Sequence, residues 1–153
     1  MKTIELTFHS FCRDEKKDVI PKTSGIYCVY VCEYSKSRRN LELVSLIYIG
    51  EAENLHDQIV GQDMLDEWKS HLTENQTLCY SFAEVDLTDM ERAEAALIYK
   101  VRPEMNGELK GDRFGFEDTE IKTSGYNAYL PKKFTVRAGK KFDSYFNKLA
   151  KAF

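Results

Sequence analysis

The feature that most constrains the fold is a pair of almost continuous apolar segments, residues 25–32 and residues 41–50, separated by a short polar stretch. A strand with one face in solvent alternates apolar and polar residues, whereas a strand covered on both faces does not. The stretch SKSRRN at residues 35–40 is the length of a hairpin loop. We therefore expect a central antiparallel hairpin that is covered on both faces.

The segment after this hairpin predicts two short helices and a third strand. Asn54 is a good N-cap for a first helix, and Gly61 interrupts that helix. Asp63 can cap a second helical segment, which carries an amphipathic stripe. Residues 78–85, LCYSFAEV, have the composition of a buried strand.

The clearest helix is expected at residues 88–101. Thr88 and Glu91 have the spacing of a capping box, which opens a helix by pairing side chains with free backbone N–H groups. Pro103 ends it, because the residue before a proline is biased away from helical geometry.

Together these segments predict an α/β (α+β) fold with a central, mainly antiparallel three-stranded sheet flanked by helices. Residues 1–19 are expected to be an N-terminal extension and residues 20–107 the functional domain. Residues 108–153 are expected to pack on the same domain as a C-terminal extension. In it we expect a hairpin at 120–123 and 128–130, followed by an amphipathic helix from 140 to 153.

Composition indicates an ordinary globular chain without a membrane segment. Of its 153 residues, 42% are hydrophobic and 31% charged. The apolar runs are too short to span a bilayer, and the N-terminus has no apolar signal region. The four cysteines lack CxxC spacing, so a reducing cytoplasm is expected, with Cys28 and Cys32 as buried thiols.

Charge is unevenly distributed along the chain. Residues 40–121 carry 6 Lys/Arg against 19 Asp/Glu, whereas residues 122–153 carry 8 against 1. An acidic chain repels phosphate, but a basic C-terminal segment attracts it. This segment is either a nucleic-acid contact or a solvated lysine-rich surface.

Glu94 is the most informative charged residue. It lies on the apolar stripe of the helix expected at 88–101, where a carboxylate is costly unless something compensates it. It is therefore either a structural glutamate in an ion pair or a metal ligand or catalytic acid. The other residues of the stripe are Met90, Ala93, Leu97, Ile98 and Val101.

Several short motifs recur in a definite order along residues 20–107. Each is weak alone, and their order and spacing make the signal. They are Pro21, Ser24-Gly25-Ile26-Tyr27, Tyr48-Ile49-Gly50, Asn54-Leu55, Glu94 with Leu97-Ile98, Pro103 and Asn106.

This ordered set resembles the GIY-YIG nuclease family. The resemblance implies an α/β domain that hydrolyses phosphodiester bonds in DNA with a divalent metal, Mg²⁺ or Mn²⁺, and it names no small-molecule cofactor. It gives no support for the last third of the chain.

The resemblance assigns roles to five side chains. Glu94 would hold the metal, and Tyr27 would activate or position the attacking water. Tyr48 would support Tyr27 near the scissile phosphate, and Asn106 would brace the site. His71 resembles, more loosely, a histidine on the helix after the motif.

The glycines of the motif, Gly25 and Gly50, would be structural, since Gly50 allows a tight backbone turn into the following helix. The family expects an arginine on that helix to clamp the phosphate, and Gln58 stands there instead. Losing one preorganised donor costs roughly 10²–10³ in rate. Arg38, Arg39, Arg113 or a lysine of the C-terminal segment could replace that charge.

Three functions follow as hypotheses. The first is a metal-dependent endonuclease, with slow cleavage a consequence of Gln58. The second is a nucleic-acid-binding module of the same fold with impaired catalysis, and the third is a protein-interaction domain that forms a homodimer through the C-terminal helix. The candidate nucleic-acid contacts are Arg38, Arg39, Lys132 and Lys133.

Overall fold

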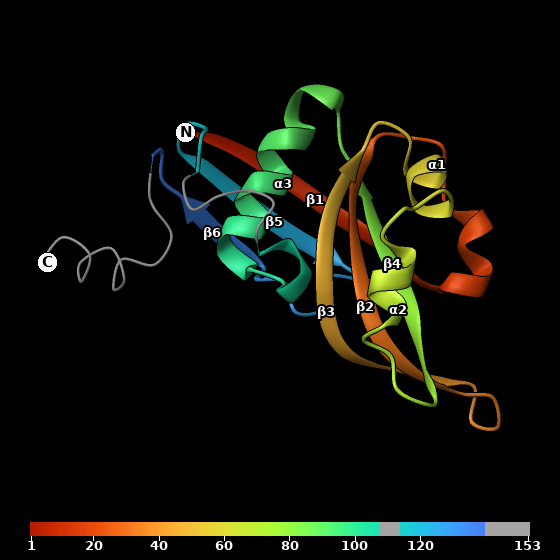
Figure 1. The fold of residues 1–153 in the computed structure, drawn as a ribbon. Coiled ribbons are helices and arrows are strands. Elements are labelled where there is room, and N and C mark those ends of the chain that lie inside the picture. The colour runs from red at the N-terminus through yellow and green to blue at the C-terminus, as the bar shows by residue number, and fades with distance from the viewer. Residues whose placement is uncertain (108–113, 140–153) are drawn as a thin grey trace, which may run out of the picture.

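A computed structural model describes residues 1–107 and 114–139, and within them the chain forms a six-stranded sheet with helices packed on it (Figure 1). The strand order is β3-β2-β4-β1-β5-β6. The α+β class agrees with the expectation, but the sheet has twice the expected number of strands among the described residues. The strands are β1 (Lys2–Arg13), β2 (Gly25–Ser35), β3 (Asn40–Ala52), β4 (Gln76–Glu84), β5 (Thr119–Gly125) and β6 (Lys133–Val136).

The helical elements are short except for one. They are the α-helices α1 (Leu55–Val60), α2 (Leu65–Lys69) and α3 (Leu87–Val101), and the 3-10 helices η1 (Asp14–Val19) and η2 (Glu104–Asn106).

The antiparallel hairpin expected from the two apolar segments is formed by β2 and β3, with a register from Gly25 opposite Ala52 to Ser35 opposite Asn40. Strand β2 lies between β3 and β4 and is buried from Gly25 to Cys32. Strand β3 is instead an edge strand and is partly exposed along its first half. The expectation that both strands are central was therefore wrong for β3.

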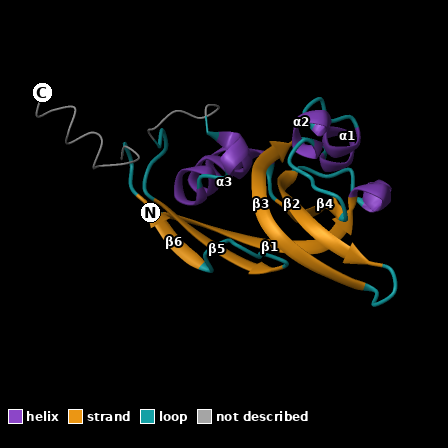
Figure 2. Cartoon of the chain, turned by 60° about the horizontal axis from the view of Figure 1, so that its bottom comes forward, coloured by secondary structure: helices purple, strands orange, loops and turns teal. Residues whose placement is uncertain are grey.

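Alternate residues of β2 point to two separate apolar cores. One core holds Ile26, Cys28 and Tyr30 together with the apolar stripe of α3. The other holds Tyr27 and Val29 together with residues of α1 and α2. Figure 2 shows α3 on one side of β3 and the pair α1 and α2 on the other.

The segment expected to be an N-terminal extension supplies β1. This strand pairs antiparallel with β4 and parallel with β5, so it joins the two halves of the sheet. Its sequence alternates buried Ile4, Leu6 and Phe8 with exposed residues, which is the pattern of a strand with one covered face.

The C-terminal hairpin differs from the expectation in its second strand. Strand β5 pairs with β6 at residues 133–136, whereas residues 128–130 lie in the connecting loop. Tyr129 has φ of 65°, which is incompatible with an extended strand at that point. The helix expected at 140–153 lies outside the described residues.

Helix ends follow local signals in most cases. The side chain of Asn54 accepts a hydrogen bond from the Asp57 N–H, as expected of an N-cap. The long helix α3 begins at Leu87 after Asp86, so the Thr88 capping box is not what opens it. It ends at Val101, and the next residue, Arg102, has a φ of 52° that turns the chain into Pro103.

Two of the four cysteines are paired. Cys32 in β2 and Cys79 in β4 form a disulfide, whereas Cys12 and Cys28 are free and buried. The expectation of a free thiol therefore holds for Cys28 and is wrong for Cys32. Among the described residues no helix is long and apolar enough to cross a membrane.

Candidate functional site

Tyr27 reaches across the edge strand because Gly50 has no side chain. The two residues face each other in the β2–β3 pairing. A Cβ atom added to Gly50 would lie 2.5 Å from the Tyr27 Oη and 2.7 Å from its Cε1, so the tyrosine ring occupies the space of the missing side chain. Since β3 is the edge strand, this arrangement carries the Tyr27 ring across β3.

Gly25 is required for a different reason. A Cβ atom there would collide with the Ala83 carbonyl oxygen of β4 and lie 2.9 Å from a methyl group of Leu55. The motif glycine at the start of β2 therefore permits close packing between β2, β4 and α1.

Tyr48 lies beside Tyr27, and the ring of Trp68 packs against both. The Tyr27 and Tyr48 ring centroids are 6.1 Å apart, and the fully buried Trp68 of α2 lies 5.2 Å from Tyr48 and 6.5 Å from Tyr27. Tyr27 is 1% exposed, whereas Tyr48 is only half-buried. Of the two phenols, Tyr48 is the one closer to solvent.

Burial and the neighbouring groups keep Tyr27 a neutral phenol. Burial raises the pKa of Tyr27 far above its usual value, and the neighbouring Tyr48 and the Glu94 carboxylate raise it further. A hydrogen bond from the Gln58 side chain opposes this and lowers the pKa. Tyr27 is therefore protonated at neutral pH, and it interacts with Tyr48, Gln58 and Glu94 at once.

Glu94 is buried, as its place on the apolar stripe predicts. It is 4% exposed and projects from α3. Its charge raises the pKa of Tyr27, which lies in the other core, so the carboxylate acts electrostatically on the phenol.

Asn106 seals the edge formed by β3. Its Oδ1 accepts a hydrogen bond from the Ile49 N–H at 2.8 Å, and its Nδ2 donates to the Ile49 carbonyl at 2.9 Å. The amide side chain thus replaces the neighbouring strand that β3 lacks at this point. Because Ile49 lies between Tyr48 and Gly50, Asn106 fixes the backbone of the candidate site.

The other predicted residues lie farther from this cluster. The Nδ1 atom of His71 lies 3.8 Å from the Glu104 carboxylate, which ties the end of α2 to η2 when the histidine is protonated. Arg38 and Arg39 lie in the turn between β2 and β3, roughly 25 Å along β2 from Tyr27. These two arginines therefore do not replace the missing clamp at the phenols, and Arg113 lies outside the described residues.

Lys132 and Lys133 lie at the opposite edge of the sheet. Lys133 is in β6 and faces Lys122 of β5, and its Nζ lies 3.7 Å from the Glu120 carboxylate. The backbone carbonyl of Lys132 accepts a hydrogen bond from Thr123. The structure does not bring these lysines to Tyr27.

Motif analysis missed one residue that contacts Tyr27. Gln62 follows α1 and donates a hydrogen bond from Nε2 to the Tyr27 hydroxyl at 3.2 Å. Gln62 lies beyond the end of α1, which closes at Val60 with Gly61 as its C-cap, so no helical spacing in the sequence identifies this contact.

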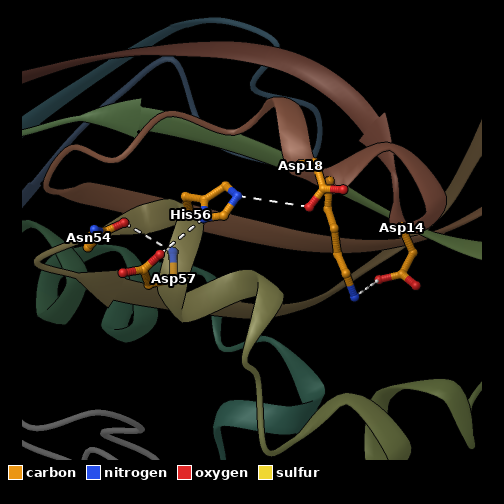
Figure 3. A network of polar contacts seen from close by, with 6 residues as sticks. Asp14, Asp18, Asn54, His56 and Asp57 are labelled. Atoms are coloured by element: carbon orange, nitrogen blue, oxygen red, sulfur yellow. Dashed lines mark hydrogen bonds and ion pairs between the residues drawn. The ribbon is translucent and has the colours of Figure 1, made fainter.

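A second polar network anchors the start of α1. In Figure 3, His56 lies beside Asp57 at 3.1 Å and points toward Asp18 of η1, 3.9 Å away. The same figure shows the Asn54 cap on Asp57. These contacts join η1 to α1 and hold the helix that carries Gln58.

The oxygen groups of the cluster suit a hard cation. A carboxylate is a ligand of the kind that Mg²⁺ accepts while it keeps several of its waters. Among the described residues there is no group of three or more His, Cys, Asp or Glu that could hold a metal. Glu94 would therefore be the main protein ligand, with water and substrate oxygens completing the shell.

Scanned against protein-family models, the chain matches no family, and searches of curated proteins and of solved structures find no match either. The resemblance to GIY-YIG nucleases rests on the motif residues themselves.

Proposed function

We propose that this chain is a divalent-metal-dependent endonuclease domain that hydrolyses phosphodiester bonds in DNA. The observation that carries the proposal is that Tyr27 from β2 and Tyr48 from β3 lie side by side at the edge capped by Asn106, where the buried Glu94 of α3 acts electrostatically on Tyr27. Residues that are distant in sequence and costly to bury are gathered there, which is typical of active sites.

Each residue has a role that follows from its surroundings. Glu94 holds the cation, which when bound polarises the phosphate and offsets its negative charge. Tyr27 is a neutral phenol, so it positions water or a phosphate oxygen by hydrogen bonding instead of removing a proton as a phenolate. Tyr48 is nearer to solvent and contacts the substrate.

Gln58 sets the expected speed of this site. It donates a hydrogen bond within the cluster but brings no positive charge to the phosphate. Removal of one preorganised donor costs roughly 10²–10³ in rate, whereas enzymes accelerate reactions by about 10⁶ or more. A slow nuclease is therefore expected.

The neutral amide at Gln58 also favours a second candidate function, a nucleic-acid-binding module without efficient cleavage. Its affinity would come from the exposed cations at the sheet ends, Arg38 and Arg39 at one and Lys132 and Lys133 at the other. Such binding weakens steeply with added salt, because each phosphate contact releases counterions. A homodimer through residues 140–153 remains a separate prediction, which truncation after Gly139 tests.

The test of the proposed function is nicking of supercoiled plasmid DNA by the purified chain with Mg²⁺, with Mn²⁺ and with EDTA. We expect slow nicking with either metal and none with EDTA. Glu94→Gln should abolish it while the circular dichroism spectrum stays unchanged. Salt-sensitive DNA binding without nicking in the wild-type protein would favour the second function.

A further inference from the structure

The side chain of Gln62 is held at both ends. Its Oε1 accepts a hydrogen bond from the Met64 backbone N–H at 3.0 Å, and its Nε2 donates to the Tyr27 Oη at 3.2 Å. A backbone N–H only donates, so the amide atom facing Met64 must be the oxygen. The orientation of the amide is therefore fixed, and its nitrogen faces Tyr27 as a donor.

This contact restricts the direction in which the proton of the Tyr27 hydroxyl can point. A phenol carries one proton and accepts through its lone pairs. Because Tyr27 accepts from Gln62, its own proton must point to another acceptor. Tyr48, whose ring centroid lies 6.1 Å from that of Tyr27, shares a hydrogen bond with it, whereas Glu94 acts on it only through its charge.

The anchor of Gln62 is itself fixed. Met64 packs against the core that contains Trp68, and Trp68 contacts both Tyr27 and Tyr48. The amide is half-buried, so water competes less for the bond than at an exposed site.

We propose that Gln62 is a positioning residue, which orients the Tyr27 hydroxyl so that its proton points away from Gln62 and toward Tyr48. Tyr27 then takes part in the reaction through hydrogen bonds whose direction is fixed. The catalytic part of this inference rests on the proposed nuclease function, whereas the orientation of the phenol does not.

Two variants separate orientation from packing. Gln62→Glu keeps the size of the side chain and the bond from Met64 N–H, but a carboxylate has no proton to donate, so Tyr27 must donate to it. Gln62→Met fills similar space and loses both bonds. Gln76→Glu is the matched control, because the Oε1 of Gln76 also accepts from a backbone N–H, that of Thr73 at 2.9 Å, far from Tyr27 along β4.

The first measurement is the NMR signal of tyrosine labelled with carbon-13 at Cζ, with the Tyr27 signal assigned by its loss in Tyr27→Phe. The second is kcat and KM for DNA nicking with Mn²⁺. We expect the Tyr27 signal to shift in both Gln62 variants and not in Gln76→Glu. We expect kcat to fall about 10- to 100-fold in Gln62→Glu, with KM changed less than about 2-fold, because a misdirected group lowers the rate more than binding.

The outcomes distinguish the inference from the function on which it rests. A Tyr27 signal that does not respond to either Gln62 variant overturns the inference, whether or not the protein nicks DNA. An unchanged kcat in Gln62→Glu in a protein that nicks DNA overturns the catalytic part alone. If the Tyr27 signal shifts in the Gln62 variants but the wild-type protein nicks no DNA, the nuclease function is overturned. The inferred orientation of the phenol then stands alone.

Discussion

At the scale of single residues, Gly50 has a strict steric requirement in the candidate site. The Tyr27 ring occupies the volume that any side chain at position 50 would need. The sequence motif predicts that Gly50 allows a tight turn. In the structure, the absence of a side chain at Gly50 lets a tyrosine on the neighbouring strand cross β3.

Gly50→Ala should therefore displace the Tyr27 ring. Overpacking of a filled site costs about 1–3 kcal/mol of unfolding free energy, and we expect nicking to fall with it. Chemical denaturation and the nicking assay measure the two effects. Gly107→Ala is the control, because its Cβ would meet nothing closer than 3.7 Å, and equal costs at both positions would contradict the steric account.

Asp14 gives a residue-scale prediction that depends on pH. Burial alone would raise the pKa of Asp14, but hydrogen bonds from Tyr80 at 2.5 Å and Lys17 at 3.0 Å, with the charges of Lys17 and Lys69, lower it overall. A lowered pKa in the folded state stabilises the protein above pH 4 or so, and this stability is lost as the pH falls through the folded pKa.

We expect Asp14→Asn to lower the unfolding free energy by about 1 kcal/mol at pH 7, a value that allows for solvent screening. The difference from the wild-type protein should shrink below about pH 4. Denaturation curves at pH 7 and pH 3 provide the comparison. An equal difference in unfolding free energy at pH 7 and pH 3 would show that the packing of the side chain, and not its charge, is responsible.

At the scale of elements, β3 is the strand that the site depends on and the one whose edge is open. Asn106 satisfies the outward N–H and carbonyl of Ile49, and the Tyr129 hydroxyl donates to the Leu43 carbonyl at 3.0 Å. Unpaired edges of sheets pair with other chains unless they are covered. These side chains cover the edge at two points.

Asn106→Leu should leave two buried backbone groups of Ile49 without partners. The expected loss is about 2–4 kcal/mol of unfolding free energy, with a greater tendency to associate. Chemical denaturation and light scattering measure these. Asn40→Ala, at the exposed start of β3, should change the unfolding free energy by less than about 0.5 kcal/mol. A similar small change at Asn106 would contradict its role as an edge cap.

The elements also show what sequence reasoning can and cannot reach. The β2–β3 hairpin and α3 were predictable because their signals are local: continuous apolar runs and a helical stripe interrupted by Glu94. Strand β1 was missed although Ile4, Leu6 and Phe8 alternate with polar residues. Its place in the sheet depends on pairing with β4 and β5, which are distant in sequence.

The candidate site also contains residues that the sequence identifies and one that it does not. Its motif residues were identifiable, and the structure brings Tyr27, Tyr48, Gln58 and Glu94 together. The contact from Gln62 was not identifiable, because it depends on the exit of the chain from α1 and on the bond to Met64.

At the scale of the whole molecule, several acidic protons are buried. Burial raises the pKa of the Cys12 thiol to about 11 and that of Cys28 to about 12, and it raises the pKa of Tyr27, Tyr30 and Tyr80 far above the usual range. Above about pH 9 the unfolded chain releases these protons while the folded chain keeps them. The unfolded state then binds fewer protons, so stability falls as the pH rises.

We therefore predict a steep decrease in unfolding free energy between about pH 9 and pH 11, measured by chemical denaturation. Absorbance at 295 nm provides the companion measurement, since it reports ionised tyrosines. Of the nine tyrosines, Tyr27, Tyr30 and Tyr80, the buried ones within the described residues, should ionise only on unfolding. Ionisation of all nine at an ordinary pKa in the folded protein would contradict the burial of these phenols.

The most direct test of the central claim is the nicking rate of Gln58→Arg compared with that of the wild-type protein, both with Mn²⁺. If Tyr27, Tyr48 and Glu94 form a hydrolytic site that lacks only a phosphate clamp, the arginine should raise the rate about 10²-fold, and Glu94→Gln should remove the gain. Absence of metal-dependent nicking in both the wild-type protein and Gln58→Arg, with each folded, would contradict the account.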